Sequence, residues 1–196
     1  MQKFIHISII PILLAIITIG VSCGGNGTPA DSESPTDVVE HGCEWSETLP
    51  ESRPSDYNIL FKYGYSKAMI NKLNTFNGTY TKDLGTDPPI TVEFRLTDED
   101  IERIYQKMVE IDFFCYPEKF VIPIPDGEIV RVDSNYLQYY FRVECNNKVK
   151  IVQWSDHIVY KNEDAEKLRW LTGLIIDLIE SKDEYWDLPS TRGLRI

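Results

Sequence analysis

Alternation of apolar and polar residues gives the first structural signal, between residues 90 and 96. Every second residue there is apolar: Ile90, Val92, Phe94 and Leu96. Since successive side chains of a strand point to opposite sides, this pattern predicts a half-buried strand. Residues 73–81 are also rich in strand-forming residues, but Asn77-Gly78 interrupts them. That pair favours a tight turn or a bulge within this strand-like stretch.

Two other segments carry apolar residues at helical spacing. In Thr97-Asp-Glu-Asp100 the hydroxyl of Thr97 can cap the amide of Asp100, which predicts a helix over 98–111. Its apolar stripe consists of Ile101, Ile104, Tyr105, Met108 and Ile111. A second helix is expected from about Asn162 to Lys182, because acidic residues begin it and a lysine ends it. Its apolar residues are Leu168, Leu171, Leu174, Ile175, Leu178 and Ile179.

A hairpin is expected between the two helices. Residues 137–144 and 148–154 are strand-like, and Asn146-Asn147 between them tolerates the positive φ angles of a type I′ turn. The preceding residues, 117–134, contain three prolines and are expected to form a long loop with an edge strand at 129–132.

Strands followed by a helix, twice over, predict the fold class. We expect an α+β fold, with a small antiparallel sheet and two helices packed on one face. Residues 57–196 suffice for a single domain of this kind.

The N-terminus is typical of a secretory signal peptide. Phe4 to Val21 is almost entirely apolar, and small residues close this run directly before Cys23. The placement of that cysteine resembles the lipobox of bacterial lipoproteins, which implies a signal peptide over 1–22 and lipidation of Cys23. The alternative is an uncleaved membrane-spanning helix, which Pro11 disfavours. Either way, the remainder of the chain would lie outside the cytoplasm, at the cell membrane or the outer membrane.

Charge separates the next segment from the body. Residues 24–56 hold eight acidic residues and a single base, Arg53, in a chain whose net charge is −11. With glycine, proline and serine among the acids, residues 23–56 are expected to form a lipidated, flexible tether. Trp45 and Cys43 interrupt its polarity, which leaves docking of its last stretch on the body as the alternative. The acidic balance excludes a nucleic-acid partner, because such binding needs lysine and arginine against phosphate.

Histidine is scarce, which disfavours general acid–base catalysis. Of the three histidines, only His157 lies in the body. Ser155, Asp156 and His157 are adjacent in an extended segment and cannot align as a triad. We therefore predict no catalytic residue, and no motif indicates a metal site or a cofactor.

Two groups of carboxylates have a second interpretation as acid–base pairs or calcium sites. The acids of residues 98–102 are explained by helix capping and the helix dipole. Asp126, Glu128 and Asp133 lack the spacing of a calcium loop and fit an ordinary turn.

Three cysteines remain after Cys23. A secreted protein can form disulfides, and Cys115 and Cys145 are the candidate pair if the end of the first helix lies over the hairpin. The alternative is that both are small buried thiols, since connectivity does not follow from spacing. No role is assigned to Cys43.

Several stretches are similar to known families. Asn74–Asp83, Ile104–Phe114 and Ala165–Arg169, with Ile179–Lys182, resemble a group of small uncharacterised bacterial envelope lipoproteins. That resemblance implies an envelope lipoprotein without an assigned activity. The order of strand, capped helix, Ile-Asp-Phe-Phe, hairpin and helix is also similar to emfourin-type protease inhibitor domains, in architecture alone.

Two functional classes follow from these observations. The first is a non-catalytic binding module, held at the membrane by its lipid, for a protein, a peptide or a wall component; protease inhibition belongs to this class. The aromatic residues that could anchor such a partner are Tyr63, Tyr65, Tyr140, Trp154 and Trp186. The alternative class is an envelope hydrolase with an unrecognised carboxylate site, which a pocket with two facing acids would favour.

Overall fold

The computed structural model describes residues 43, 45, 49–65 and 67–193. They belong to one unit of the chain, which begins at His41. The expected signal peptide and Cys23 lie outside the described residues.

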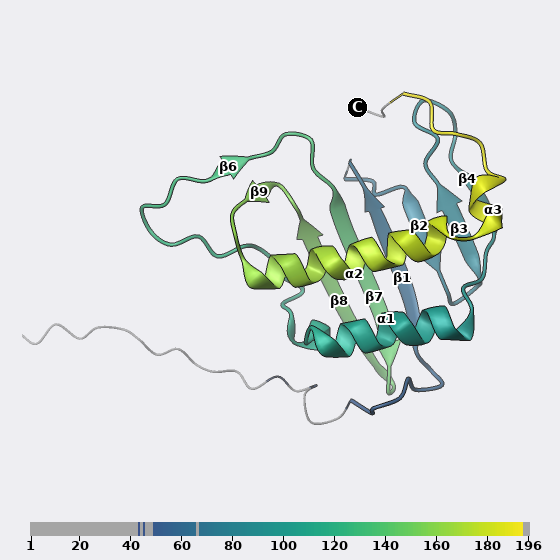
Figure 1. The fold of residues 1–196 in the computed structure, drawn as a ribbon, viewed down its shortest axis with the longest axis horizontal. Helices are drawn as coiled ribbons and strands as arrows, with labels where there is room; N and C mark the ends of the chain where they lie inside the picture. The colour runs from purple at the N-terminus through teal and green to yellow at the C-terminus, as the bar shows by residue number, and fades with distance from the viewer. Residues whose placement is uncertain (1–42, 44, 46–48, 66, 194–196) are drawn as a thin grey trace, which may run out of the picture. The chain divides into compact units, whose positions relative to one another are not determined.

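A seven-stranded sheet forms the centre of the fold, in the spatial order β4-β3-β2-β1-β7-β8-β5 (Figure 1). Its strands are β1 (Asn58–Gly64), β2 (Asn71–Asn74), β3 (Thr79–Lys82), β4 (Ile90–Glu93), β5 (Lys119–Phe120), β7 (Gln138–Cys145) and β8 (Lys148–Ser155). Neighbouring strands are antiparallel except β5, which runs parallel to β8. The sheet is therefore antiparallel, as predicted, except at this edge, where β5 makes it mixed. β5 has only two residues within the proline-rich loop, too short for any alternation to mark it.

The longest pairing joins β7 and β8 across the turn at Asn146 and Asn147, as the sequence predicts. Both asparagines have positive φ angles, 51° and 59°, as a type I′ turn requires. The expected edge strand also forms, as β6 (Arg131–Val132). It pairs with β9 (Ile158–Val159) in a separate two-stranded sheet.

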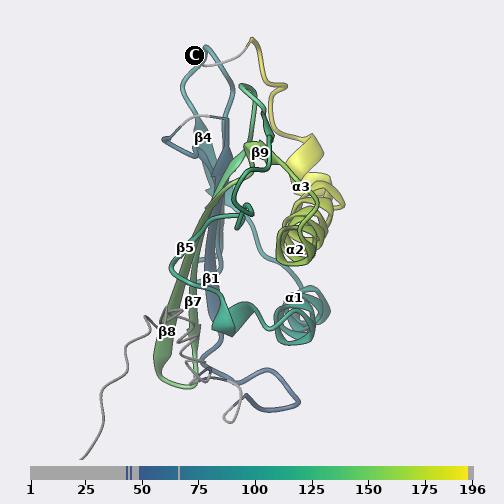
Figure 2. The same cartoon turned by 90° about the vertical axis from the view of Figure 1, so that its left-hand side faces the viewer.

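Two long helices cover one face of the large sheet, which confirms the predicted α+β fold (Figure 2). The first is α1 (Asp98–Glu110), whose capping box between Thr97 and Asp100 is present as predicted. The second, α2 (Glu163–Glu180), begins where Asn162 accepts a hydrogen bond from the amide of Ala165. A short 3₁₀ helix (Phe113–Cys115) follows α1, and α3 (Asp183–Trp186) follows α2.

The core lies between the sheet and these helices. Alternate residues of the two central strands point into it: Ile59, Phe61 and Tyr63 from β1, and Tyr139, Phe141 and Val143 from β7. Ile104 and Met108 of α1, with Leu168, Leu171 and Ile175 of α2, complete it. Every second residue of the strands thus packs against the apolar stripes of the two helices, whose residues recur every three or four positions.

The end of the expected tether packs against this body. Cys43 forms a disulfide with Cys115, and Trp45 stacks on Phe114 with ring centroids 5.0 Å apart. The hydroxyl of Tyr105 donates to the carbonyl oxygen of Pro50 at 2.6 Å. A flexible tether reaching to residue 56 is therefore wrong for its last part, because aromatic and covalent contacts outweigh the polarity of that segment.

The candidate disulfide between Cys115 and Cys145 is also wrong. Cys145 is a free thiol, fully buried at the end of β7. Cys115, at the end of the 3₁₀ helix that follows α1, pairs instead with Cys43 of the N-terminal segment. The alternative interpretation, that both cysteines are buried thiols, is correct for Cys145 and wrong for Cys115.

Candidate functional site

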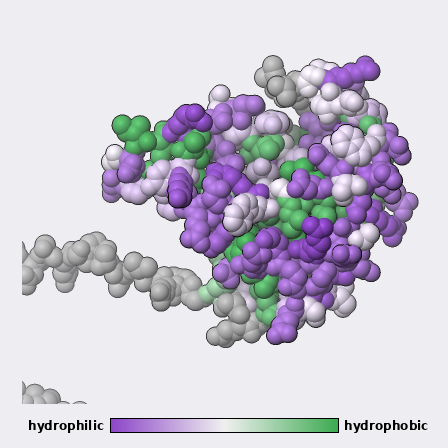
Figure 3. All heavy atoms as spheres, viewed as in Figure 1, coloured by the Kyte–Doolittle hydropathy of each residue, from purple (hydrophilic) through white to green (hydrophobic). Residues whose placement is uncertain are grey.

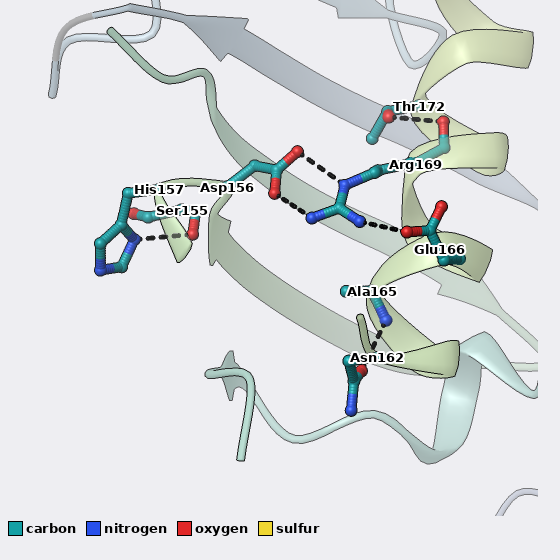
Figure 4. A network of polar contacts seen from close by, with 8 residues as sticks. All are labelled: Ser155, Asp156, His157, Asn162, Ala165, Glu166, Arg169 and Thr172. Carbon is teal, nitrogen blue, oxygen red and sulfur yellow. Dashed lines mark hydrogen bonds and ion pairs between the residues drawn. The ribbon is translucent and has the colours of Figure 1, made fainter. Parts of the chain in front are cut away.

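The residues that resembled a triad turn away from one another. The Nδ1 atom of His157 lies 2.9 Å from the backbone carbonyl oxygen of Ser155. The carboxylate of Asp156 instead faces Arg169 of α2 (Figure 4). Ser155, Asp156 and His157 therefore do not act as one catalytic unit.

The acids at the start of α1 are engaged in structural contacts. The carboxylate of Asp100 accepts hydrogen bonds from the amide of Thr97 at 2.9 Å and from the ammonium of Lys182. Burial raises the pKa of Asp100, but these hydrogen bonds outweigh it and leave the pKa below its usual value. Asp98 pairs with Arg53 at 3.2 Å. Helix capping thus accounts for these residues.

The loop acids show no convergence. Asp126, Glu128 and Asp133 are all exposed. Within the part of the chain that the structure describes, no three metal-ligating side chains come together. The same loop carries apolar side chains on its surface: Val121, Ile129 and Val132 are exposed, Ile129 by 97% (Figure 3).

The expected aromatic anchors divide into two groups. Tyr63 and Trp154 are buried in the core, whereas Tyr65 and Trp186 are exposed by 54% and 70%. Tyr140 is half-buried on the face of the sheet opposite the helices, where the ammonium of Lys62 lies 5.3 Å from its ring centroid. Lys62 is directly opposite Lys72 on this face.

A first cavity, of about 350 Å³, lies beside the N-terminal half of α2. We call it the Arg169 cavity. The guanidinium of Arg169 donates to both oxygens of Asp156, at 2.6 and 3.0 Å, and to Glu166 at 2.6 Å (Figure 4). The hydrogen bond to Asp156 raises the pKa of Arg169, so this cation stays charged and paired.

A second cavity, of about 300 Å³, lies at the other end of α2. We call it the Lys82 cavity. Its lining residues come from the ends of β1, β2 and β3, from α2 and α3, and from the C-terminal segment; they include Tyr63, Tyr65, Asn71, Lys82, Leu137, Ile176, Glu180, Tyr185 and Thr191. The volume is at the lower end of the range of small-molecule sites.

Lys82 is the most unusual residue of this cavity. Its side chain is directed to the core side of β3 together with Tyr80, and it is only 8% exposed. The ammonium lies 4.1 Å from the ring centroid of Tyr185. No hydrogen bond or ion pair joins it to any residue that the structure describes. Burial lowers the pKa of Lys82, since the charged form loses hydration there.

Tyr185 also holds Glu180, one of the two acidic residues of the cavity, the other being Asp83. Its hydroxyl donates to Glu180 Oε1 at 3.1 Å, and the indole of Trp186 donates to the backbone oxygen of Glu180 at 2.7 Å. Burial raises the pKa of Tyr185 to about 12, so this hydroxyl keeps its proton at neutral pH.

The polar wall of the cavity is fixed by Asn71. Its side-chain oxygen accepts hydrogen bonds from the amide of Asp83 at 2.9 Å and from the hydroxyl of Tyr80 at 3.4 Å. Tyr80 in turn bonds to the hydroxyl of Tyr63 at 2.8 Å. This chain of contacts holds the ends of β1, β2 and β3 in one arrangement around Lys82.

Residues 191–193 close one side of the cavity by pairing with the chain after β3. The amide of Thr86 donates to the oxygen of Arg192 at 3.0 Å, and the amide of Arg192 donates to the oxygen of Leu84 at 3.1 Å. Between them, Gly85 has a φ of 73°, and a Cβ atom there would lie 2.3 Å from the oxygen of Arg192. Only glycine allows this close approach.

The sequence did not single out Lys82, although one signal was present. Lys82 occupies the same strand phase as the buried Tyr80, where an apolar residue is the usual choice. Its environment also depends on Tyr185, about a hundred residues later in the chain, which local patterning does not reveal.

Comparison of the chain with protein-family models, with curated proteins and with solved structures finds no match.

Proposed function

We propose that this protein is a lipid-anchored, non-catalytic binding module outside the cytoplasm, and that its Lys82 cavity binds a small ligand through an anionic group. The observation that carries the proposal is the largely buried side chain of Lys82, whose ammonium lines the cavity and has no hydrogen-bond acceptor among the described residues.

The cost of burying such a charge supports this proposal. A lysine without a partner loses its hydration, and proteins ordinarily pair or expose it. Contact with the face of Tyr185 offsets only part of that loss. A carboxylate or phosphate in the cavity would supply the missing acceptor and convert the cost into ligand affinity.

The location rests on two other features. The N-terminal pattern ending at Cys23 indicates a lipid anchor. A disulfide such as Cys43–Cys115 is typical of proteins outside the cytoplasm. Among the described residues, no helix has the length and hydropathy that crossing a bilayer requires.

The alternative, a hydrolase, has one observation in its favour. Asp156 and Glu166 both line the Arg169 cavity, as two facing acids of a carboxylate site would. Both carboxylates are bound to the same guanidinium, whereas a general acid or base must reach the substrate. This arrangement fits structural support better than catalysis.

Anion binding by the full chain in detergent tests the proposed site. Isothermal titration calorimetry with 3-phenylpropionate and with inorganic phosphate should detect binding of at least one of them. The Lys82→Met variant should lose about tenfold or more in affinity. Lys72→Met makes the same chemical change outside the cavity and should leave binding intact. Absence of binding, or an equal loss in both variants, would contradict the proposal.

A turnover screen separates the two functional classes. Generic esterase, phosphatase, glycosidase and peptidase substrates should not be turned over by the protein. Turnover that falls about 100-fold in Asp156→Asn, at unchanged melting temperature, would establish the hydrolase instead.

The anchor has its own test. Cys23→Ala should release the protein from the membrane fraction, because the lipid is then absent. If this variant resists washing with carbonate, the N-terminal apolar segment spans the membrane and the lipoprotein interpretation fails.

A further inference from the structure

Two acidic residues, Asp83 and Glu180, also line the Lys82 cavity, and Asp83 accepts a hydrogen bond from the amide of Gly85. Glu180 is near the C-terminal end of α2, and its carboxylate accepts a hydrogen bond from Tyr185. No ion pair joins Glu180 to Lys82 or to any other described residue. Lys82 and Glu180 therefore line one small cavity with opposite formal charges and without a direct contact, and their attraction offsets only part of the effect of burial on the pKa of Lys82.

Tyr185 explains why the two charges stay apart. Its ring contacts the ammonium of Lys82 at 4.1 Å from the centroid, while its hydroxyl binds Glu180 at 3.1 Å. The same side chain thus holds the cation on its face and the carboxylate at its tip. A tyrosine ring is rigid, so it maintains this separation in the absence of a ligand.

Besides the polar side chains of Asn71, Asp83 and Thr191, the cavity has an apolar and aromatic part. Leu137 and Ile176 contribute aliphatic surface, and Tyr63 and Tyr65 contribute rings. A volume of about 300 Å³ accommodates a small molecule. An acceptor for Lys82, a donor for Glu180 and an apolar group between them would together satisfy this site.

We propose that the Lys82 cavity binds a zwitterionic small molecule of the amino-acid class, with its carboxylate on Lys82, its ammonium on Glu180 and an apolar or aromatic side chain against Leu137 and Ile176. This inference rests on the proposed function, since it names the ligand class of the same cavity. Charge-assisted hydrogen bonds at both ends would make the site selective for ligands that carry both groups.

Three related compounds test the inference on the wild-type protein. Phenylalanine carries both charged groups, 3-phenylpropionate lacks the ammonium, and 2-phenylethylamine lacks the carboxylate. Calorimetry with the full chain in detergent should show that phenylalanine binds about tenfold or more tighter than either analogue. Because only the ligand changes, this comparison does not depend on the folding of a variant.

Variants then assign each charged group to its residue. Glu180→Gln keeps an acceptor for Tyr185 and should bind phenylalanine no better than 3-phenylpropionate. Lys82→Met should bind phenylalanine no better than 2-phenylethylamine. Lys72→Met is the control and should keep the wild-type order. Thermal unfolding of each variant checks that the fold is retained.

Failure of this inference differs from failure of the proposed function. If 3-phenylpropionate binds as tightly as phenylalanine, and Glu180→Gln changes nothing, the amino-acid class is wrong while an anion site at Lys82 remains. If Lys82→Met changes the affinity of neither carboxylate, both are wrong. If phenylalanine does not bind at all, the inference is overturned, even if 3-phenylpropionate or inorganic phosphate binds.

Discussion

Helix α2 has a cavity near each of its ends, and the two cavities treat positive charge in opposite ways. In the Arg169 cavity, three hydrogen bonds from the guanidinium bind two carboxylates. In the Lys82 cavity, the lysine residue as a whole is more fully buried, and its ammonium contacts only the face of Tyr185 among the described residues. A satisfied cation contributes to the structure, whereas an unsatisfied one lowers stability unless a ligand supplies the acceptor. The difference therefore distinguishes a structural cluster from a binding site.

Removal of the disulfide gives the largest expected effect and serves as a reference for both cavities. Neither Cys43 nor Cys115 lines them. The disulfide joins residues 72 positions apart, so Cys43→Ser with Cys115→Ser should lower the free energy of unfolding by about 4 kcal/mol. Urea unfolding measures this loss. Ligand affinity at the Lys82 cavity should stay unchanged below the melting temperature; a parallel loss would mean that the N-terminal segment shapes the cavity.

Arg169→Met tests whether the first cavity is structural. Two carboxylates would lose their common partner, and the free energy of unfolding should fall by about 2 kcal/mol. Arg103→Met is the matched control, because Arg103 is exposed on α1 and forms no ion pair with a described residue. Equal stability of the two variants in urea would contradict a structural role for Arg169.

Gly85→Ala tests whether residues 191–193 shape the second cavity. An alanine at a φ of 73° should cost about 1–2 kcal/mol, and its Cβ would also displace the backbone of Arg192. Gly127 has a φ of 87° and open space around it, so Gly127→Ala carries the conformational cost alone. We expect only Gly85→Ala to weaken anion binding in calorimetry. Equal binding by both variants would mean that residues 191–193 do not shape the cavity.

Lys82→Met should have the smallest effect on stability, with the opposite sign. Replacing a buried, unpaired charge by an apolar side chain of similar length should raise the free energy of unfolding by at most about 1 kcal/mol. The pKa of Lys82 is lowered in the folded protein from its ordinary value of 10.5. The unfolded chain therefore binds more protons between these two pKa values, and the wild type gains stability as the pH rises through that interval.

The advantage of Lys82→Met should consequently be largest near neutral pH and shrink toward pH 10.5. Urea unfolding of wild type and variant in parallel measures this difference in the free energy of unfolding. The ionisation of the tyrosines contributes equally to both proteins and therefore cancels from the difference. A difference that does not depend on pH, or a variant less stable than wild type throughout, would mean that Lys82 has a partner in the folded state.

Local patterning predicted the elements that local chemistry determines. The capping box at Thr97, the turn at Asn146-Asn147 and the two apolar stripes led directly to α1, the β7–β8 hairpin and α2. Strand β1, at the centre of the sheet, was not singled out, although Ile59, Phe61 and Tyr63 alternate in it. Lys62 within the strand, and Gly64 and Tyr65 at its end, weakened that signal.

The features that matter most for the site depend on contacts between distant residues. The partner of Cys115 lies 72 residues earlier, in a segment whose acidity indicated a flexible tether. Lys82 looks like an ordinary surface lysine in the sequence, and its burial follows from α2, α3 and the C-terminal segment. Spacing within a single segment carries no information on such contacts.

The central claim is that the ammonium of Lys82 lacks a partner until an anion binds. Nuclear magnetic resonance of the lysine side chains, in the full chain with and without 3-phenylpropionate, measures the pKa of this group directly, and Lys82→Met assigns its signal. The expected result is one lysine whose pKa is below the ordinary value of 10.5 in the free protein and rises when the carboxylate is added. A Lys82 signal that titrates at the ordinary value, and does not respond to the carboxylate, would contradict the account.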